Sequence, residues 1–263
     1  NAIQVVDGGD GTLNGSDYII FYATGPHRWL KDWVAKSFNQ QKNLYSEESY
    51  YYISVGGSGK RVPVTGPVPG ANLAVTDFTA QYFFELDTIN FLSSGREWYG
   101  EEFSDAPGKT RSRNYTFSIP GIAGKPALFR SHTMARSFGT ASRFNVRINN
   151  QPVLQADIFP VANGPYDLYA QENSGNAAFV PDQSNLTVTF DYTPGSFQSQ
   201  GWLDWFEVLA RVDLSMIGIN QLLFRDWNSV APGNVGQFII KNVPAGVQVW
   251  NVTNALEPVR MQG

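Results

Sequence analysis

Residues 144–158, FNVRINNQPVLQADI, give the clearest indication of the fold. Apolar residues at positions 144, 146 and 148 alternate with polar ones, which is typical of a strand with one buried face. Asn149 and Asn150 follow directly, and Asn tolerates the left-handed backbone conformation that a two-residue hairpin turn requires. The stretch therefore predicts a β-hairpin whose second strand runs from Pro152 to Ile158.

The same alternation recurs on both sides of this hairpin. It is found in residues 115–119 and 186–192, a further strand is expected over Phe129 to Ala135, and Trp202 to Leu214 is a long final strand. Several short alternating strands with regular turn signals are typical of an antiparallel sandwich, and about 100 residues is a natural size for one. We predict an all-β protein in which residues 109–216 form a jelly-roll-like antiparallel β-sandwich.

Residues 1–108 are expected to form a separate β-rich N-terminal domain, bounded by the polar, turn-rich segment 104–113. The apolar run Tyr18 to Ala23 predicts a strand buried on both faces, and Tyr82 to Leu92 predicts another strong strand. The best helical candidate is Trp29 to Phe38, where apolar residues fall at i, i+4 and i+5, and an irregular aromatic-rich loop is the equal alternative.

Short strand signals follow Leu214, at residues 222–224, 237–240 and 247–252. They are too few to form a domain alone. We expect residues 217–252 to complete the N-terminal domain, with residues 253–263 as a linker toward a further domain.

The composition excludes several kinds of site. The chain of 263 residues has no cysteine, which rules out disulfides, thiolate zinc sites and a catalytic cysteine within it. The net charge of −4 argues against nucleic acid as a partner, because nucleic-acid binders concentrate positive charge. The chain begins at Asn1 without a leader, and we expect a processed or truncated sequence.

An acidic loop at residues 7–17 is the first candidate site. Residues 10–17, DGTLNGSD, resemble the second half of an EF-hand calcium loop. In that register Val6 and Gly8 would occupy the first two ligand positions, and neither has a side-chain oxygen. A tight turn held by Asx-type hydrogen bonds is favoured, and no metal site is predicted.

The two histidines, His27 and His132, lie far apart in the sequence, which makes a histidine zinc site improbable. There is no Gly-x-Ser-x-Gly turn of the kind that presents a catalytic serine. A structural role is favoured for both histidines.

Two groups of carboxylates raise the possibility of glycoside hydrolysis, which uses paired acids. Glu97, Glu101 and Glu102 form the first group, and Asp204 and Glu207 form the second. In a regular strand an odd separation points Asp204 and Glu207 to opposite faces, which is poor geometry for joint acid–base work. We predict no catalytic, cofactor-binding or metal-binding residue and no cofactor.

The seven tryptophans leave an alternative function open. Exposed aromatic rings on a sandwich, with Trp202 and Trp205 as candidates, could stack on sugars. The alternative is therefore a free-standing carbohydrate-binding module of a secreted bacterial protein.

Five segments together resemble the N-terminal region of the PorU family. They are residues 11–29, GTLNGSDYIIFYATGPHRW; 38–52, FNQQKNLYSEESYYY; 94–103, SGREWYGEEF; 201–207, GWLDWFE; and 249–254, VWNVTN. Their order and spacing carry the likeness, although Gln40 stands where that family commonly has a histidine.

PorU proteins are the cell-surface sortases, or C-terminal signal peptidases, of the type IX secretion system of Bacteroidetes. They are similar to gingipains, whose Cys-His dyad lies in a domain after this region. The resemblance implies that this chain is a non-catalytic accessory region at the outer-membrane surface. The implied partners are the downstream peptidase domain, secreted cargo, outer-membrane secretion subunits and anionic lipopolysaccharide.

Overall fold

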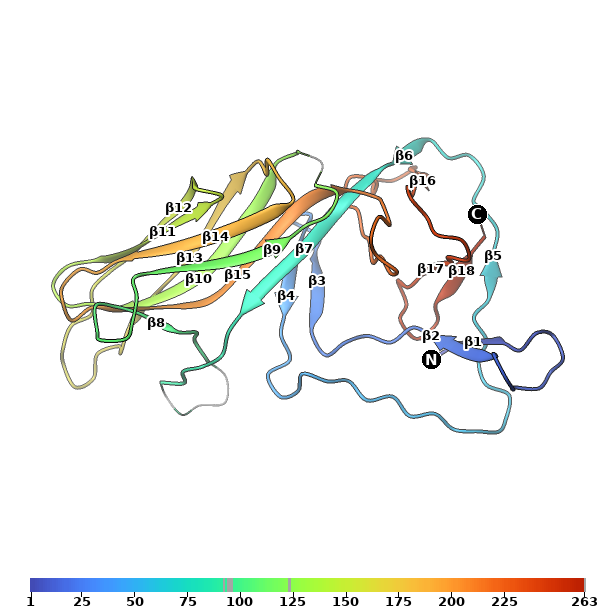
Figure 1. Cartoon of the computed structure of the whole chain (residues 1–263), viewed down its shortest axis with the longest axis horizontal. Coiled ribbons are helices and arrows are strands. Elements are labelled where there is room, and N and C mark those ends of the chain that lie inside the picture. Colours follow the sequence, from blue (N-terminus) through green and yellow to red (C-terminus); the bar gives the residue numbers. More distant parts are fainter. Residues whose placement is uncertain (92, 94–96, 123, 263) are drawn as a thin grey trace. The chain divides into compact units, whose positions relative to one another are not determined.

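The computed structural model describes residues 1–91, 93, 97–122 and 124–262. Strands and loops account for all of these residues, and the described ranges contain no helix. The all-β prediction is therefore confirmed (Figure 1).

The chain divides into two compact units. The first comprises residues 1–74, 231–237 and 242–263, and the second comprises residues 75–230 and 238–241. Each unit is described separately below.

Two antiparallel sheets form the second unit, which is a β-sandwich. One sheet has the order β13-β10-β15-β7, with β8 also paired to β15. Its strands are β7 (Asp77–Glu85), β8 (Glu102–Phe103), β10 (Ala127–Arg136), β13 (Gln171–Phe179) and β15 (Gln200–Asp213). The other sheet has the order β12-β11-β14-β9. Its strands are β9 (Ser112–Ser118), β11 (Ser142–Ile148), β12 (Gln151–Ile158) and β14 (Asn185–Thr193).

The core of the sandwich is rich in aromatic rings. Phe206 of β15 is fully buried, and six rings from both sheets lie within 6.3 Å of its ring centroid. The six belong to Tyr82, Phe84, Tyr115, Phe117, Phe129 and Phe190. Alternation along each strand delivers these rings to one face, so the sequence pattern itself builds the core.

The hairpin predicted at residues 144–158 is confirmed. β11 and β12 pair antiparallel from Ser142–Ile158 to Ile148–Gln151. Asn149 and Asn150 have φ of 49° and 67°, as a two-residue turn with two left-handed positions requires. The Asn149 side chain also accepts a hydrogen bond from the Thr187 amide, which ties the turn to β14.

Short strands form the first unit. β1 (Ile3–Val6) pairs with β2 (Tyr18–Phe21), β3 (Arg28–Asp32) pairs with β4 (Ser37–Gln41), and β18 (Val259–Met261) lies between β17 (Val249–Asn251) and β5 (Val64–Thr65). β6 (Leu73–Val75) pairs with β16 (Gly236–Phe238). Residues 217–252 thus contain β16 and β17, but residues 222–224 form no strand.

Two expectations for the first unit are wrong. The segment Trp29 to Phe38, considered as a helix or an irregular loop, is a hairpin, because the Asp32 carboxylate accepts hydrogen bonds from the amides of Val34 and Ala35 and Lys36 is left-handed with φ of 47°. The strand at Tyr18 is not buried on both faces, since Tyr18 is 50% exposed. β2 has a single neighbour, β1.

The observed unit boundaries differ from the expected ones. The sandwich unit starts at residue 75, not 109, because β7 pairs with β15 along nine residues. At the other end, residues 259–261 of the expected linker form β18. The boundary between the units therefore lies before the turn-rich segment 104–113, because aromatic side chains of β7 are part of the sandwich core.

Candidate functional site

A polar cluster lies on the outer face of the five-stranded sheet, at a β-bulge in β15. The pairing of β10 with β15 shifts register between His132 and Thr133, so that His132 faces Trp205 while Thr133 faces Leu203. Asp204 is the extra residue between these pairs. A bulge locally turns a side chain to the other face of its strand, and here it brings Asp204 to the face that carries His132.

His132 lies between two carboxylates. Its Nδ1 is 2.8 Å from Asp204 Oδ2, and its Nε2 is 3.7 Å from Glu172 Oε2 on β13. Tyr99 donates its hydroxyl to the other oxygen of Glu172. The cluster therefore links three strands and the segment that carries Tyr99.

Burial and charge act in opposite directions on His132. Burial lowers the pKa of the imidazole, but the hydrogen bond and charge of Asp204, with the charges of Glu172 and Glu97, outweigh it and raise the pKa above its ordinary value. Burial, followed by the hydrogen bond to Glu172, raises the pKa of Tyr99. The surroundings thus favour the protonated form of His132 and the neutral form of Tyr99.

This arrangement can hold a proton, but it presents no nucleophile. In the described part of the chain, no hydroxyl is hydrogen-bonded to His132. Its near neighbours are acids that stabilise the cation, whereas a general base for a serine or water needs a free acceptor nitrogen. The geometry favours a polar cross-link, as expected for a structural histidine.

The other carboxylates have separate partners. Glu207 lies on the same face as Asp204, so the predicted separation of the two onto opposite faces is wrong, and the bulge is the reason. The Glu207 side chain is 4% exposed and lies 2.6 Å from Arg130 Nε. A carboxylate held in this way is an ion-pair partner, and it is not poised as an acid or base.

The remaining acidic group is also dispersed. Glu101 lies 2.9 Å from Arg113, and Glu102 accepts a hydrogen bond of 2.7 Å from Ser104. Glu97 is exposed, and residues 94–96 of the segment that resembles PorU lie outside the described residues. The three glutamates therefore do not form an acid–base pair with one another.

The acidic loop at residues 7–17 forms Asx-type turns. The carboxylates of Asp7, Asp10 and Asp17 accept hydrogen bonds from the amides of Gly9, Thr12 and Asn14. Among the described residues, no group of three or more His, Cys, Asp or Glu side chains could hold a metal ion. The bonds to Asp7 and Asp10 are of the Asx type that the sequence favours.

His27 has partners on both ring nitrogens. Its Nε2 is 2.8 Å from Glu47, and its Nδ1 is 3.0 Å from the amide nitrogen of Asn43. This agrees with the structural role expected for it.

The tryptophans proposed for sugar stacking have different environments. Trp202 is 1% exposed and packs edge-on against Phe91 at 4.7 Å, so its ring has no free face. Trp205 is partly exposed, between Phe83 and His132 at 6.1 Å from each. Of these two tryptophans, Trp205 is the one with an accessible ring.

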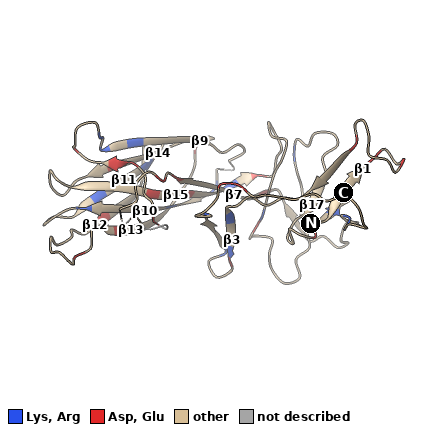
Figure 2. Ribbon diagram, turned by 90° about the horizontal axis from the view of Figure 1, so that it is seen from below, with Lys and Arg blue, Asp and Glu red and all other residues tan. Residues whose placement is uncertain are grey.

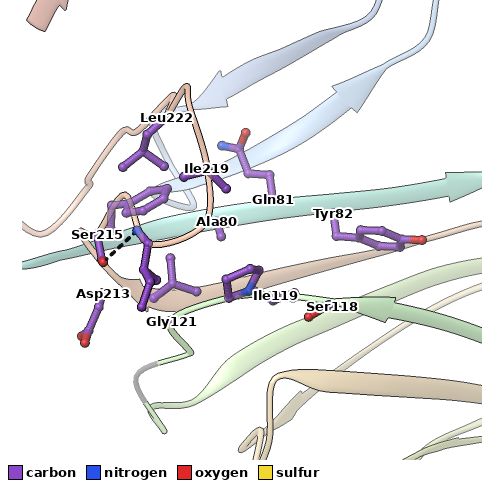
Figure 3. Close-up of a pocket in the computed structure, with 14 residues that line it drawn as sticks. Ala80, Gln81, Tyr82, Ser118, Ile119, Gly121, Asp213, Ser215, Ile219 and Leu222 are labelled. Carbon is purple, nitrogen blue, oxygen red and sulfur yellow. Dashed lines mark hydrogen bonds between the residues drawn. The ribbon is translucent and has the colours of Figure 1, made fainter. Parts of the chain in front are cut away.

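A second feature of the sandwich unit is an apolar pocket of about 200 Å³ (Figure 3). It lies beside β7 and β15 and is bordered by the loop after β9 and by residues 215–222. Figure 2 marks the positions of Lys, Arg, Asp and Glu along the strands, and Arg147 and Asp191 form one ion pair of this unit at 2.7 Å. The pocket is therefore an apolar concavity within the sandwich unit.

Comparison with known proteins finds a solved structure with a similar fold. No protein-family model and no curated protein sequence matches the chain. The crystal structure of dimeric latent PorU from Porphyromonas gingivalis matches 99% of the chain with a TM-score of 0.79 and 20% identity. The chain has a PorU-like fold. It spans 24% of the PorU chain in that structure.

Two sugar-binding modules give much weaker matches than PorU. A CBM36 domain of a xylanase from the hindgut metagenome of Trinervitermes trinervoides covers 49% of this chain, with 12% identity and a TM-score of 0.32. A CBM36 module in complex with calcium and xylotriose covers 51%, with 10% identity and a TM-score of 0.29. These chains are covered over 96% and 99% of their own lengths. The likeness to PorU extends over both units.

The described residues contain no helix long and apolar enough to cross a membrane.

Proposed function

We propose that this chain is the non-catalytic N-terminal region of a gingipain-like sortase and signal peptidase of the type IX secretion system. Its role is to support or position the peptidase domain, secreted cargo or partner subunits at the cell surface. The observation that carries the proposal is the likeness to PorU over 99% of the chain. The order of the five PorU-like sequence segments supports it independently.

The cluster around His132 is compatible with this role. Its acids and imidazole are engaged with one another, and the chain has no cysteine that could serve as the peptidase nucleophile. In this proposal the thiolate chemistry belongs to a separate domain of the same polypeptide. This chain contributes a scaffold and surfaces.

The reading frame beyond the codon for Gly263 gives the first test. The proposal expects a peptidase domain with a Cys-His dyad to follow, and a frame without one would overturn it. The second test is complementation in a type IX-secreting bacterium whose own copy of this gene lacks the codons for residues 1–263. Cleavage of cargo sorting domains should fail in that strain and return when the full gene is restored.

A variant in the same assay separates the scaffold role from sugar binding. Trp205→Ala changes the partly exposed ring that the carbohydrate-binding alternative would need. If the scaffold role holds, cargo processing persists and the purified chain binds no sugar on a glycan array. Glycan binding that is lost in Trp205→Ala would favour the alternative instead.

A further inference from the structure

The free edge of β9 meets the apolar pocket at one end. β9 is the terminal strand of its sheet, and its ladder with β14 runs without a register shift from Ser112–Asp191 to Ser118–Asn185. The pocket is lined in part by Ser118, Ile119, Pro120 and Gly121, which directly continue β9. Figure 3 shows Ile119 and Ser118 on one side of the pocket, with Ile219 and Leu222 on the other.

The hydrogen bonds at the two ends of β9 show which backbone groups point outward. The Arg111 carbonyl accepts from the Tyr192 amide, and the Ile119 amide donates to the Ser184 carbonyl. In an antiparallel ladder, residues that exchange hydrogen bonds with the partner alternate with residues whose groups point away. Odd-numbered residues of β9 therefore face β14, and Asn114, Thr116 and Ser118 direct their backbone groups to the free edge.

These outward groups are unpaired within the described part of the chain. The side chains of Asn114 and Thr116 bond sideways to Thr189 and Thr187 on β14, which leaves the strand edge itself uncovered. Natural edge strands are usually protected by proline, lysine or a bulge. β9 reads SRNYTFS and has no proline, lysine or bulge. Its one charged residue, Arg113, lies near the N-terminal end and pairs with Glu101, so the edge from Asn114 to Ser118 is a regular template for another strand.

We propose that β9 accepts an extended polypeptide segment by strand addition, and that the pocket takes one aliphatic side chain of that segment. Strand addition draws affinity from main-chain hydrogen bonds and specificity from pockets for alternate side chains. The neighbours dictate the chemistry of the partner. Tyr115 and Phe117 on the inner face favour apolar residues at alternate positions, and Thr116 on the outer face favours polar residues between them. The volume of about 200 Å³ accommodates one leucine or isoleucine side chain.

The inference does not rest on the proposed sortase role, because strand addition would operate in any β-sandwich with this edge. The probe is the synthetic peptide Lys-Thr-Val-Thr-Leu-Thr-Val-Thr-Lys, titrated into the ¹⁵N-labelled 263-residue chain. The expected result is slower hydrogen exchange at the amides of Asn114, Thr116 and Ser118, with shifts at Ala80 and Ile219 in the pocket. The same peptide with Asp in place of Leu should bind more weakly.

Two variants at one position separate backbone from side-chain effects. Thr116→Pro removes an outward N–H at an edge where proline is tolerated, and it should weaken peptide binding about tenfold. Thr116→Val keeps the N–H and should bind like the unmodified chain. Ile217→Asp places a charge beside the pocket at a residue that is 62% exposed. It should weaken peptide binding although β9 itself is unchanged.

Three results would overturn the proposal. Equal binding by Thr116→Pro and Thr116→Val would show that the edge is not used. Equal binding of the Leu and Asp peptides would show that the pocket is not used. Protection of the three amides that rises with protein concentration in the absence of peptide would show that a second copy of the chain occupies the edge.

Discussion

Replacement of Phe206 with alanine tests the aromatic core most directly. Phe206 is fully buried, and its ring is surrounded by six others drawn from β7, β9, β10 and β14. A buried aromatic side chain removes about 200 Å² from water, worth roughly 5 kcal/mol at about 25 cal/mol/Å². Because alanine retains part of that burial, Phe206→Ala should lower the free energy of unfolding by about 4 kcal/mol, within the usual range for such changes.

Urea unfolding followed by circular dichroism and tryptophan fluorescence measures this loss. Phe197→Ala is the matched control, because the Phe197 side chain is 83% exposed and its truncation should cost under about 0.5 kcal/mol. A loss at Phe206 below about 1.5 kcal/mol, or one equal to that of the control, would refute the description of this ring as the centre of the core.

Three further predictions address the cluster, the turn and a close contact. His132→Gln tests the raised pKa: a raised folded-state pKa contributes stability below the unfolded value of about 6.5 and loses it as the pH rises through the folded value. The difference in urea stability between the parent and His132→Gln should therefore be largest near pH 5.5 and shrink toward pH 9, and a difference that grows over that interval would contradict it. Asn150 has φ of 67°, so Asn150→Gly should leave the melting temperature unchanged or raise it, whereas Asn150→Val should destabilise by about 1–3 kcal/mol; equal melting temperatures for the two variants would argue against the left-handed turn. At Gly201 an added Cβ would lie 2.7 Å from Tyr192 Cε2 and 2.8 Å from Phe144 Cζ, so Gly201→Ala should cost about 1–3 kcal/mol by overcrowding, and an unchanged melting temperature would show that the rings move aside freely.

Strands with strict alternation were predictable from the sequence. β9, β11, β12 and β14 each carry apolar residues at every second position, and tertiary packing simply uses that face. The Asn149-Asn150 turn was predictable for the same local reason.

β13 could not be found in this way. Its sequence, QENSGNAAF, contains almost no β-branched or aromatic residue, and its extended form depends on pairing with β10. Packing bears on one of its small residues: a Cβ on Gly175 would lie 2.6 Å from Leu154 Cδ2 on β12, so a larger residue there would require the Leu154 side chain to shift. Such a constraint arises only in the folded sandwich and produces no periodic pattern in the sequence.

The hairpin of β3 and β4 was expected to be a helix or an irregular loop, because its tryptophan spacing also fits a helical face. The Asx turn at Asp32 and the left-handed Lys36 decide the conformation, and both are local backbone effects that periodicity does not register.

The site was less predictable than the fold, although one signal was available. With strict alternation Asp204 would share a face with Phe206, and a carboxylate would enter an aromatic core. The bulge avoids this by turning Asp204 to the outer face of the sheet. Glu172 and Tyr99 are distant in the sequence and could not have been assigned to His132 without the sheet order.

The pairing of β7 with β15 joins residue 77 to residue 213. A chain that emerges from the ribosome in order must hold β7 without its partner while more than half of the protein is made, and loop closure over such a separation is slow. During that interval Tyr82 and Phe84 have no core to enter, and exposed strands of this kind associate with other chains. Refolding of the purified chain should therefore be slow and sensitive to protein concentration, and in the cell a holding chaperone would act on the unpaired β7 before the last strand of the sandwich arrives.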